Sequence, residues 1–178
     1  MQFLASLAAT TCGLVFVVSG LDHVGRPRAL SDALATHGFE SNGLRVALAT
    51  MIGLVEASLG LVGLFAVILQ APILEVTLFA IASLYGIYAL YATWLVRRRP
   101  WAPCGCSSRQ HVINIWVPIR AAALGAGSLV AAIAVEQVYA PSSSAQHVTV
   151  ATAGVAWAAL LWTLPEAMAD SPPRVQPA

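Results

Sequence analysis

The chain contains no lysine and few charged residues of any kind. Its nine basic side chains are all arginine, eight acidic side chains nearly balance them, and charged residues occupy only 10% of the 178 positions, against about 25% in soluble domains. This near-neutrality argues against nucleic acid as a partner. Because 58% of the residues are hydrophobic, a soluble fold of this size could not bury the apolar surface.

Cysteine is also scarce, and several familiar catalytic motifs are missing. Cys12, Cys104 and Cys106 are too few and too unevenly placed for the disulfide framework of a small secreted domain. No phosphate-binding glycine loop, nucleophile elbow or His-Glu-x-x-His motif occurs, so nucleotide hydrolysis and the common hydrolase reactions have no support. Cys12 lies within an apolar run, and we interpret it as a small buried hydrophobic residue.

The chain has long apolar runs instead. At about 1.5 Å of rise per residue, a helix of about 20 residues crosses the ~30 Å hydrocarbon core of a bilayer. The sequence therefore predicts an all-α, polytopic transmembrane helix bundle with about five spans, and four as the alternative count. The expected spans are 3–21, 46–69, 73–96, 112–138 and 148–168. They form a single domain over residues 1–169, followed by a disordered tail over 170–178.

Two further features of the spans can be predicted. The run 3–21 is expected to be a retained span rather than a cleaved signal peptide, because Met1-Gln2 before it carries no basic side chain. The polar segment after it is expected to form a short helix at the membrane surface, opened by Pro27 and closed by His37-Gly38. Small residues that recur at helical spacing predict contact faces between spans. These residues are Gly53, Gly60, Gly63, Ala123, Gly127 and Ala131.

The arginines are distributed unevenly between the two sides of a five-span bundle. The loop between the first two spans carries Arg26, Arg28 and Arg45, and the loop after the third span carries Arg97, Arg98, Arg99 and Arg109. In a five-span bundle these loops lie on the same side as Arg174 of the tail. The N-terminus, the turn at Gln70 and the loop 139–147 lie on the other side and carry no arginine. Short cytoplasmic loops are enriched in basic residues. The pattern predicts a multi-pass protein of the cell inner or plasma membrane, with its N-terminus outside and its C-terminus and cysteine loop in the cytoplasm.

The densest motif is Cys104-Gly105-Cys106, directly after Arg97-Arg98-Arg99. Glycine between two cysteines permits the tight backbone that an internal disulfide needs, and a strained ring is readily reduced. Neighbouring arginines favour the thiolate, which attacks disulfides and binds metals. Three interpretations remain open from spacing: redox exchange by Cys104 and Cys106, half of a metal site with His111 as a third ligand, or incidental loop cysteines.

Two ionisable residues, Glu56 and Arg120, fall inside spans, where an unpaired charge costs at least ~2.5 kcal/mol. Both should face the bundle interior at compatible depths, so we hypothesise that they pair. The pair would be either a structural ion pair or a proton relay or quinone-head contact near the cysteines. His23, at the end of the first span, is either a proton carrier or an ordinary solvated helix end.

Several of these residues together resemble the MauE branch of the MauE/DoxX-like membrane proteins. The resemblance covers residues 14 to 125, and Cys104-Gly105-Cys106 is its most specific element. The other elements are Ser19-Gly20, Gly53-Leu54-Val55-Glu56-Ala57-Ser58-Leu59-Gly60, Trp116 and Arg120. The chain departs from the family pattern at Ser107-Ser108 (usually Phe-Gly), at Ala121 (usually Asn) and at His23, near a position that often carries Lys.

The resemblance implies a multi-pass protein of thiol-disulfide chemistry. In methylamine-using bacteria the family is linked to maturation of the small subunit of methylamine dehydrogenase, which is rich in disulfides. Thioredoxin-like proteins that face the outside are the family's partners, whereas the charge asymmetry places the cysteine loop inside. Either reducing equivalents pass across the membrane or the span count differs by one.

The leading hypothesis is a membrane component of thiol-disulfide exchange, a thiol-disulfide oxidoreductase component if it is an enzyme. Cys104 and Cys106 cycle between dithiol and disulfide, Arg97, Arg98 and Arg99 lower their pKa, and a thioredoxin-like protein exchanges with them, with a disulfide-rich client beyond. One alternative is a non-catalytic membrane assembly or transport factor. The second is a quinone-linked disulfide-generating enzyme, in which Arg120 or aromatic side chains contact the quinone head group; no other cofactor and no metal is expected.

Overall fold

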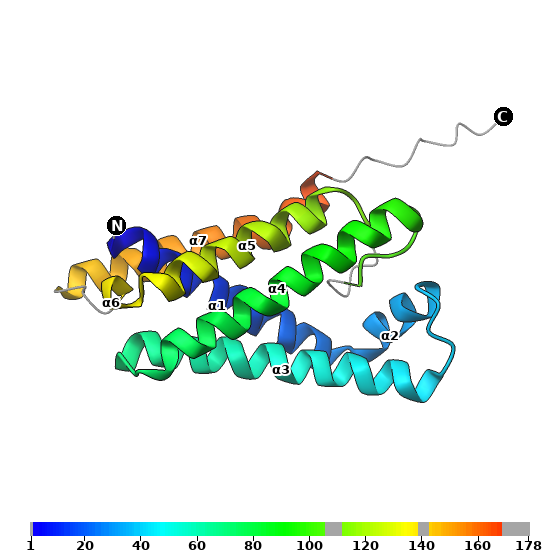
Figure 1. Ribbon diagram of the computed structural model, residues 1–178, viewed down its shortest axis with the longest axis horizontal. Coiled ribbons are helices and arrows are strands. Elements are labelled where there is room, and N and C mark those ends of the chain that lie inside the picture. Colours follow the sequence, from blue (N-terminus) through cyan, green and yellow to red (C-terminus); the bar gives the residue numbers. More distant parts are fainter. Residues whose placement is uncertain (1, 106–111, 139–142, 169–178) are drawn as a thin grey trace.

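The computed structural model describes residues 2–105, 112–138 and 143–168. Five helices in these ranges are long and apolar enough to cross a membrane. They are α1 (Gln2–Gly25), α3 (Asn42–Leu69), α4 (Ile73–Arg98), α5 (Trp116–Ile133) and α7 (Ser144–Ala167). The short helices α2 (Pro27–Thr36) and α6 (Val135–Val138) complete the fold (Figure 1). The predicted all-α bundle with five spans is confirmed, and the predicted disordered tail lies outside the described residues.

Local chemistry explains where several helices begin and end. Pro27 opens α2, where its missing N–H costs nothing, and His37 ends it, as predicted. The Ser41 hydroxyl accepts a hydrogen bond from the Leu44 N–H at the start of α3. At the other end of α3, Gln70 adopts a left-handed conformation (φ 51°) that reverses the chain into α4. The expected tight turn is therefore present.

The fourth predicted span, 112–138, differs from the structure. Its first residues belong to the preceding loop, because the Ile113 N–H donates to the Ala102 carbonyl at 2.9 Å. The helix begins only at Trp116, whose N–H donates to the Asn114 side chain at 3.0 Å. It is also interrupted at Ala134, between α5 and α6. The predicted span was too long at its start because the apolar run includes Ile113, a buried residue of the preceding loop.

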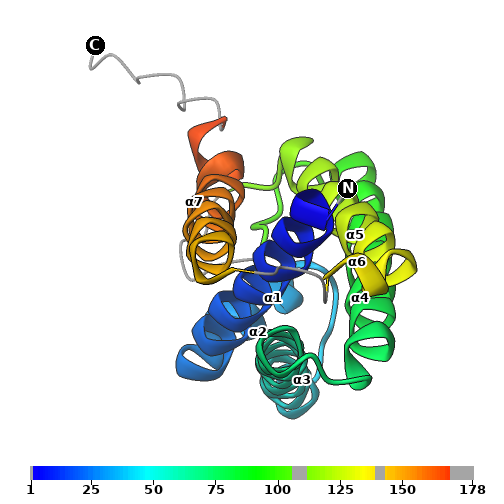
Figure 2. The same ribbon diagram turned by 90° about the vertical axis from the view of Figure 1, so that its left-hand side faces the viewer.

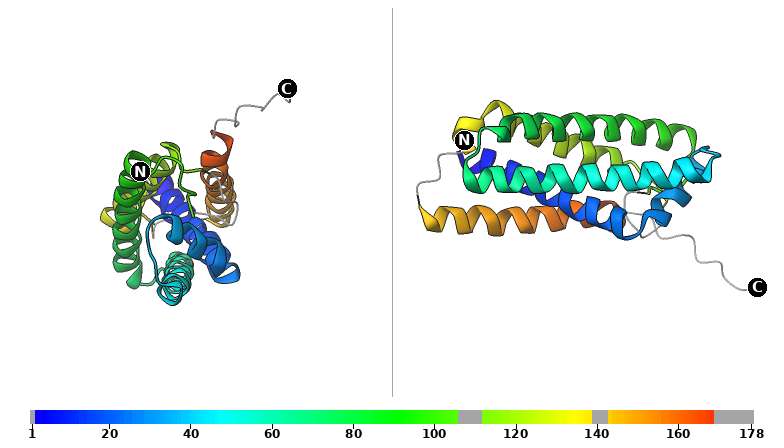
Figure 3. Two further views of the ribbon diagram at one scale, coloured as in Figure 1. Left: turned by 90° about the vertical axis from the view of Figure 1, so that its right-hand side faces the viewer. Right: turned by 90° about the horizontal axis from the view of Figure 1, so that it is seen from below.

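Helix α1 lies in the middle of the bundle and packs against α3, α5 and α7, while α4 packs against α5 (Figures 2 and 3). The predicted small-residue contacts on α3 are present at Gly53 and Gly60. A Cβ atom on Gly53 would lie 2.9 Å from the His23 Cβ, and one on Gly60 would lie 2.7 Å from the Val17 nitrogen. Gly20 of α1 lies against α3 in the same way. These glycines allow close backbone approach.

The remaining predicted small-residue positions are more mixed. A Cβ on Gly63 would find ordinary contacts at 3.5 Å or more, and Gly127 lies near Cys12 without tight packing. Ala131 is completely buried, whereas Ala123 is exposed. The buried face of α5 therefore differs from the predicted row Ala123, Gly127 and Ala131. It consists of residues such as Leu124, Ser128 and Ala131.

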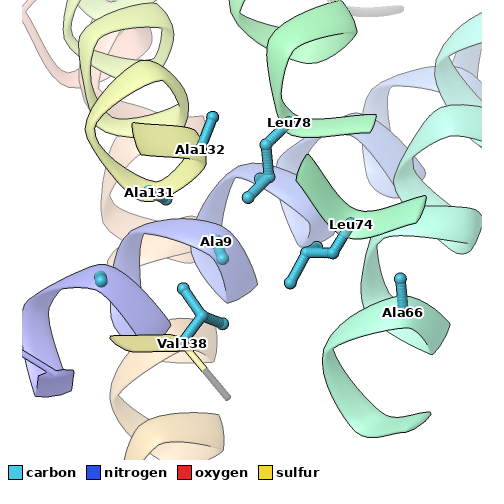
Figure 4. Close-up of a cluster of buried hydrophobic side chains, with 8 residues drawn as sticks. Ala9, Ala66, Leu74, Leu78, Ala131, Ala132 and Val138 are labelled. Atoms are coloured by element: carbon cyan, nitrogen blue, oxygen red, sulfur yellow. The ribbon is translucent and has the colours of Figure 1, made fainter. Parts of the chain in front are cut away.

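The two ends of the bundle carry different features. We call the end that holds α2, the last turn of α4 and the loop with Cys104 the cysteine-loop end, and the other the opposite end (Figures 1 and 3). The opposite end holds the N-terminus, the turn at Gln70 and α6. It encloses a cluster of buried hydrophobic side chains from α1, α3, α4, α5 and α6 (Figure 4). The cluster consists of Ala5, Ala9, Ala66, Leu74, Leu78, Ala131, Ala132 and Val138.

Candidate functional site

Cys104 lies in the loop that connects α4 to α5, and it is disulfide-bonded. The base of this loop is closed by an antiparallel bridge between Pro103 and Val112. The Cys104 side chain is partly buried and packs against a hydrophobic cluster that includes Leu95 and Val117. Cys106 and His111, which the sequence analysis named as candidate site residues, lie outside the described residues. The described part of the motif is therefore a sulfur in a disulfide at the edge of the bundle.

A buried histidine ties this loop to α2. The Nε2 atom of His37 lies 3.0 Å from the Pro103 carbonyl oxygen, and its Nδ1 atom lies 2.8 Å from the Tyr91 hydroxyl of α4. A carbonyl can only accept, so Nε2 carries the proton and donates, and Nδ1 accepts from Tyr91. His37 thus joins α2, α4 and the residue before Cys104.

Burial lowers the pKa of the His37 imidazole, and the nearby Arg99 charge lowers it further, while the hydrogen bond to Pro103 opposes both effects. The neutral form is therefore the favoured one in the folded protein. Sequence reasoning treated His37 only as the end of a helix. A histidine–glycine pair is a common helix end, and no local pattern indicated its distant partners at Tyr91 and Pro103.

Gly105 fixes the loop against α2 by a second means. Its φ of +67° lies in the left-handed region, which favours glycine. A Cβ atom at this position would lie 3.0 Å from side-chain atoms of Ala33 and of Leu30. The glycine between the two cysteines therefore serves both backbone conformation and close packing on α2.

The three arginines before the loop have different surroundings. Arg99 donates from Nη1 to the Thr36 carbonyl at the end of α2 at 2.5 Å. Arg97 and Arg98 are exposed residues in the last turn of α4. Arg99 therefore anchors α2 to α4, and the predicted effect of all three arginines on thiol pKa stays a prediction.

Deeper in the bundle, Glu56 of α3 pairs with His23 of α1. The His23 Nε2 and Glu56 Oε2 atoms are 3.7 Å apart, and both side chains are less than a tenth exposed. Ser19 and Tyr88 lie within hydrogen-bonding reach of the same carboxyl group. His23 is thus not a solvated helix end but the partner of a buried acid, brought close by the packing of Gly53 against α1, and its role as a proton carrier stays a prediction.

Arg120 of α5 is directed toward α7 rather than paired directly with Glu56. Its Nη1 atom lies 3.5 Å from the Leu161 carbonyl and 3.4 Å from the Trp162 carbonyl. The guanidinium lies 5.8 Å from the centre of the Trp162 ring. Among the described residues, His23 is the ionic partner of Glu56 within 4 Å. The expected Glu56–Arg120 ion pair is replaced by a longer-range attraction between two groups of one cavity.

Several of these groups line one cavity of about 140 Å³. Cys104 and Gly105 contribute to its wall, together with His23, His37, Glu56 and Arg120. The remaining lining is mostly aliphatic and aromatic, with side chains from α1, α2, α3, α4, α5 and α7. The structure therefore brings the cysteine loop and the buried ionisable residues, which are far apart in sequence, to one apolar chamber.

The metal-site alternative falls on Cys106 and His111, which lie outside the described residues, so it stays a prediction. Within the described ranges, no group of three His, Cys, Asp or Glu side chains is placed to hold a metal ion. Cys12 is 2% exposed, and its sulfur donates to the Leu124 carbonyl at 3.4 Å. It packs within the core of the bundle, in agreement with its interpretation as a buried hydrophobic residue.

Comparison with known proteins gives one match. Neither curated proteins nor solved structures include a significant match to the chain. A family model described as "Methylamine utilisation protein MauE" matches residues 1–135 of the 178. The match includes the glycines of the α1–α3 contact, Glu56, the cysteine loop and Arg120, and it ends before α7 begins. The chain therefore belongs to the MauE family of multi-pass membrane proteins.

Proposed function

We propose that this MauE-family protein is a membrane component of thiol-disulfide exchange that supports maturation of a partner protein. The observation that carries the proposal is the disulfide-bonded Cys104, held on α2 by His37 and Gly105 and adjoining a cavity with buried acid and base groups. The family description associates the chain with methylamine utilisation. A disulfide-rich client such as the small subunit of methylamine dehydrogenase fits that association.

Thiol-disulfide exchange conserves atoms and electrons between the two proteins, so this step needs no cofactor. A thiolate of the partner attacks one sulfur of the Cys104 disulfide, forms a mixed disulfide and expels the other sulfur as a thiolate. A second partner thiol then attacks the mixed disulfide. The partner leaves with a disulfide, and this chain keeps two thiols. A thioredoxin-like protein suits this step because its own thiolate is nucleophilic near neutral pH.

His37 and Arg99 act as positioning residues in this scheme. His37 holds the Pro103 carbonyl beside Cys104, and Arg99 holds the end of α2 against α4. A loop with fixed ends presents its sulfur in one orientation, which lowers the entropic cost of reaching the in-line geometry for attack.

A trapping experiment tests the proposal. Cys106→Ser leaves Cys104 as a single thiol, whose thiolate attacks the disulfide of an oxidised partner and expels one partner sulfur as a thiolate. Because the motif then has no second thiol to release the partner, the mixed disulfide should persist and be visible on a non-reducing gel. Cys12→Ser, which removes the buried third cysteine, is the matched control and should behave as wild type. If Cys106→Ser traps no partner and the wild-type pair keeps one redox state in cells, the proposal is wrong. Full complementation of a deletion by Cys104→Ala/Cys106→Ala would instead favour the assembly or transport factor.

Labelling of Cys104 with a membrane-impermeant thiol reagent, added from each side of the membrane after reduction, identifies which partners can reach it. The five helices keep the cysteine loop at the same end as Arg26, Arg28 and Arg45. Charge asymmetry therefore continues to favour the cytoplasmic side. Labelling from outside only would reverse the predicted orientation and leave the exchange chemistry intact.

A further inference from the structure

The cavity beside Cys104 contains buried polar atoms that have no hydrogen-bonding partner. The Tyr85 hydroxyl is in this state, and the Glu56 Oε2 atom has no hydrogen bond beyond its 3.7 Å ion-pair contact with His23; both residues line the cavity. Tyr85 is 5% exposed and Glu56 3%. A buried polar group left unsatisfied costs about 1–3 kcal/mol, so native proteins normally supply it with a partner. Two such groups facing one chamber indicate a ligand with hydrogen-bonding atoms.

The other walls of the chamber define the shape of that ligand. Phe16 and Tyr85 meet edge to face, with ring centres 4.6 Å apart, and Tyr88 and Trp162 add further aromatic surface. The volume is about 140 Å³, close to the engineered cavity of about 150 Å³ that accommodates a benzene molecule in another protein. One six-membered ring therefore fits, flanked by apolar side chains and contacted by a few polar groups.

The charges of the chamber limit the ligand further. Glu56 and Arg120 contribute opposite charges to the lining, so the chamber has no excess positive charge to hold an anion such as a phosphate group. Within the described residues no cluster suits a metal ion. The chamber lies within a bundle whose spans are surrounded by lipid, so a lipid-soluble molecule has direct access to the protein. A neutral ring with oxygen acceptors can take hydrogen bonds from the Tyr85 hydroxyl and the Arg120 guanidinium.

We infer that this cavity binds the head group of a quinone, which accepts electrons from the reduced cysteine loop. The inference rests on the proposed function and names its electron acceptor. After exchange, the chain holds Cys104 as a thiol. Re-formation of the disulfide releases two electrons and two protons, and the quinone takes up both pairs to become a quinol. The buried Glu56–His23 pair provides acid and base groups beside the ring.

A binding titration tests the ligand directly. The probe is decylubiquinone, added to the purified full-length protein in detergent, and quenching of tryptophan fluorescence reports binding because Trp162 lines the cavity. Wild type and Cys104→Ser should bind saturably. Tyr85→Phe keeps the ring and deletes the unpaired hydroxyl, so the Kd should rise about threefold to tenfold. Glu56→Gln gives a second, independent change of the lining and should also alter the Kd.

Thr11→Val is the matched control. It removes another buried hydroxyl that lacks a partner, but one that does not line the cavity. Its Kd should equal that of wild type. The inference is overturned if decylubiquinone does not bind saturably, or if Tyr85→Phe and Glu56→Gln both bind it as tightly as wild type does.

Electron transfer separates this inference from the proposed function. Anaerobically reduced wild-type protein mixed with decylubiquinone should form one quinol for each Cys104 disulfide recovered. If no quinol forms in a protein that still traps a thioredoxin-like partner, the inference that a quinone accepts the electrons is wrong, and the proposed thiol-disulfide exchange is unaffected. If quinol forms in a protein that exchanges with no thiol partner, the quinone inference is supported and the proposed exchange with a partner protein is wrong.

Discussion

The two ends of the bundle satisfy buried polar groups in different ways. At the opposite end, the Ser6 hydroxyl donates to the Val138 carbonyl and the Thr77 hydroxyl donates to the Ile73 carbonyl. Around them alanines and leucines fill the space between helices (Figure 4). The cavity that Cys104 helps to line extends from the cysteine-loop end to Glu56 and Tyr85, and there the Tyr85 hydroxyl and the Glu56 Oε2 atom make no hydrogen bond, although Oε2 also contacts His23. One end is built to hold helices together, and the other keeps space and unused hydrogen-bonding capacity.

The contact between α1 and α3 supports the second of these ends, and its disruption should have the largest effect. A Cβ atom on Gly20 would lie 2.2 Å from the Ala57 nitrogen, so Gly20→Leu forces two backbones apart. We expect a loss of about 3 kcal/mol or more in the free energy of unfolding, measured by denaturation in detergent. Gly86→Ala is the control, because a Cβ there meets nothing within 4 Å. Equal stability of the two variants would contradict this packing.

Truncation at the opposite end should damage stability and spare the chemistry. Leu78 is 1% exposed within the Ala/Leu cluster. Leu78→Ala leaves a cavity and should cost about 2–3 kcal/mol of unfolding free energy. Leu90→Ala, at a position 75% exposed, should cost much less. Below its melting temperature Leu78→Ala should form the mixed disulfide at the wild-type rate, and a slower rate would show that the two ends are coupled.

Removal of the His37 anchor should loosen the cysteine-loop end. His37→Phe deletes the hydrogen bonds to Tyr91 and Pro103 and should cost about 1–3 kcal/mol of unfolding free energy at pH 7.5. It should also slow mixed-disulfide formation, because the loop that carries Cys104 is less fixed.

The difference between wild type and His37→Phe should depend on pH. The pKa of His37 is lowered in the folded state from 6.5, so below pH 6.5 the unfolded chain takes up a proton that the folded chain resists. The contribution of His37 to stability is therefore full above pH 6.5 and decreases as pH falls from that value toward the lowered pKa. Unfolding free energies of both proteins between pH 5 and pH 8 measure this, and a difference that grows as pH falls would contradict it.

The arginines at the end of α4 should give the smallest effects. Arg98→Ala removes an exposed charge that salt screens, and we expect at most about a twofold change in mixed-disulfide formation. Arg99→Ala also removes the hydrogen bond to Thr36, so its effect should be larger, with unfolding free energy lower by about 1 kcal/mol. Rates of mixed-disulfide formation in the two variants, measured at low and high salt, separate the effect of the arginine charge, which salt screens, from the effect of the hydrogen bond to Thr36. A larger effect for Arg98 would show that charge dominates.

Much of the fold could be predicted from the sequence because lipid imposes simple rules on it. A helix that crosses the bilayer must be long and apolar, and this requirement is visible residue by residue. The five spans and α2, with Pro27 at its start and His37 at its end, follow from such local patterns. The start of α5 did not, because Ile113 is apolar for burial in a loop and not for contact with lipid.

The site was only partly accessible to the same reasoning. Cys104, Glu56, Arg120 and His23 could be singled out, since each residue type is conspicuous in an apolar chain. Their partners could not, because a partner is set by the rotation of each helix about its axis and by how closely two helices approach. Glycines at positions 20 and 53 bring His23 rather than Arg120 to Glu56.

By itself, then, the sequence determined the number of spans, the clustering of arginine at one end and the presence of a cysteine pair there. Only the tertiary structure decided that His37 anchors the cysteine loop and that Tyr85 and Glu56 share a cavity with Cys104. The physical reason is that solvent preference acts on each residue separately. Hydrogen bonds and cavities, in contrast, depend on the relative positions of side chains that are 30 to 70 residues apart, such as His37 and Pro103, 66 residues apart.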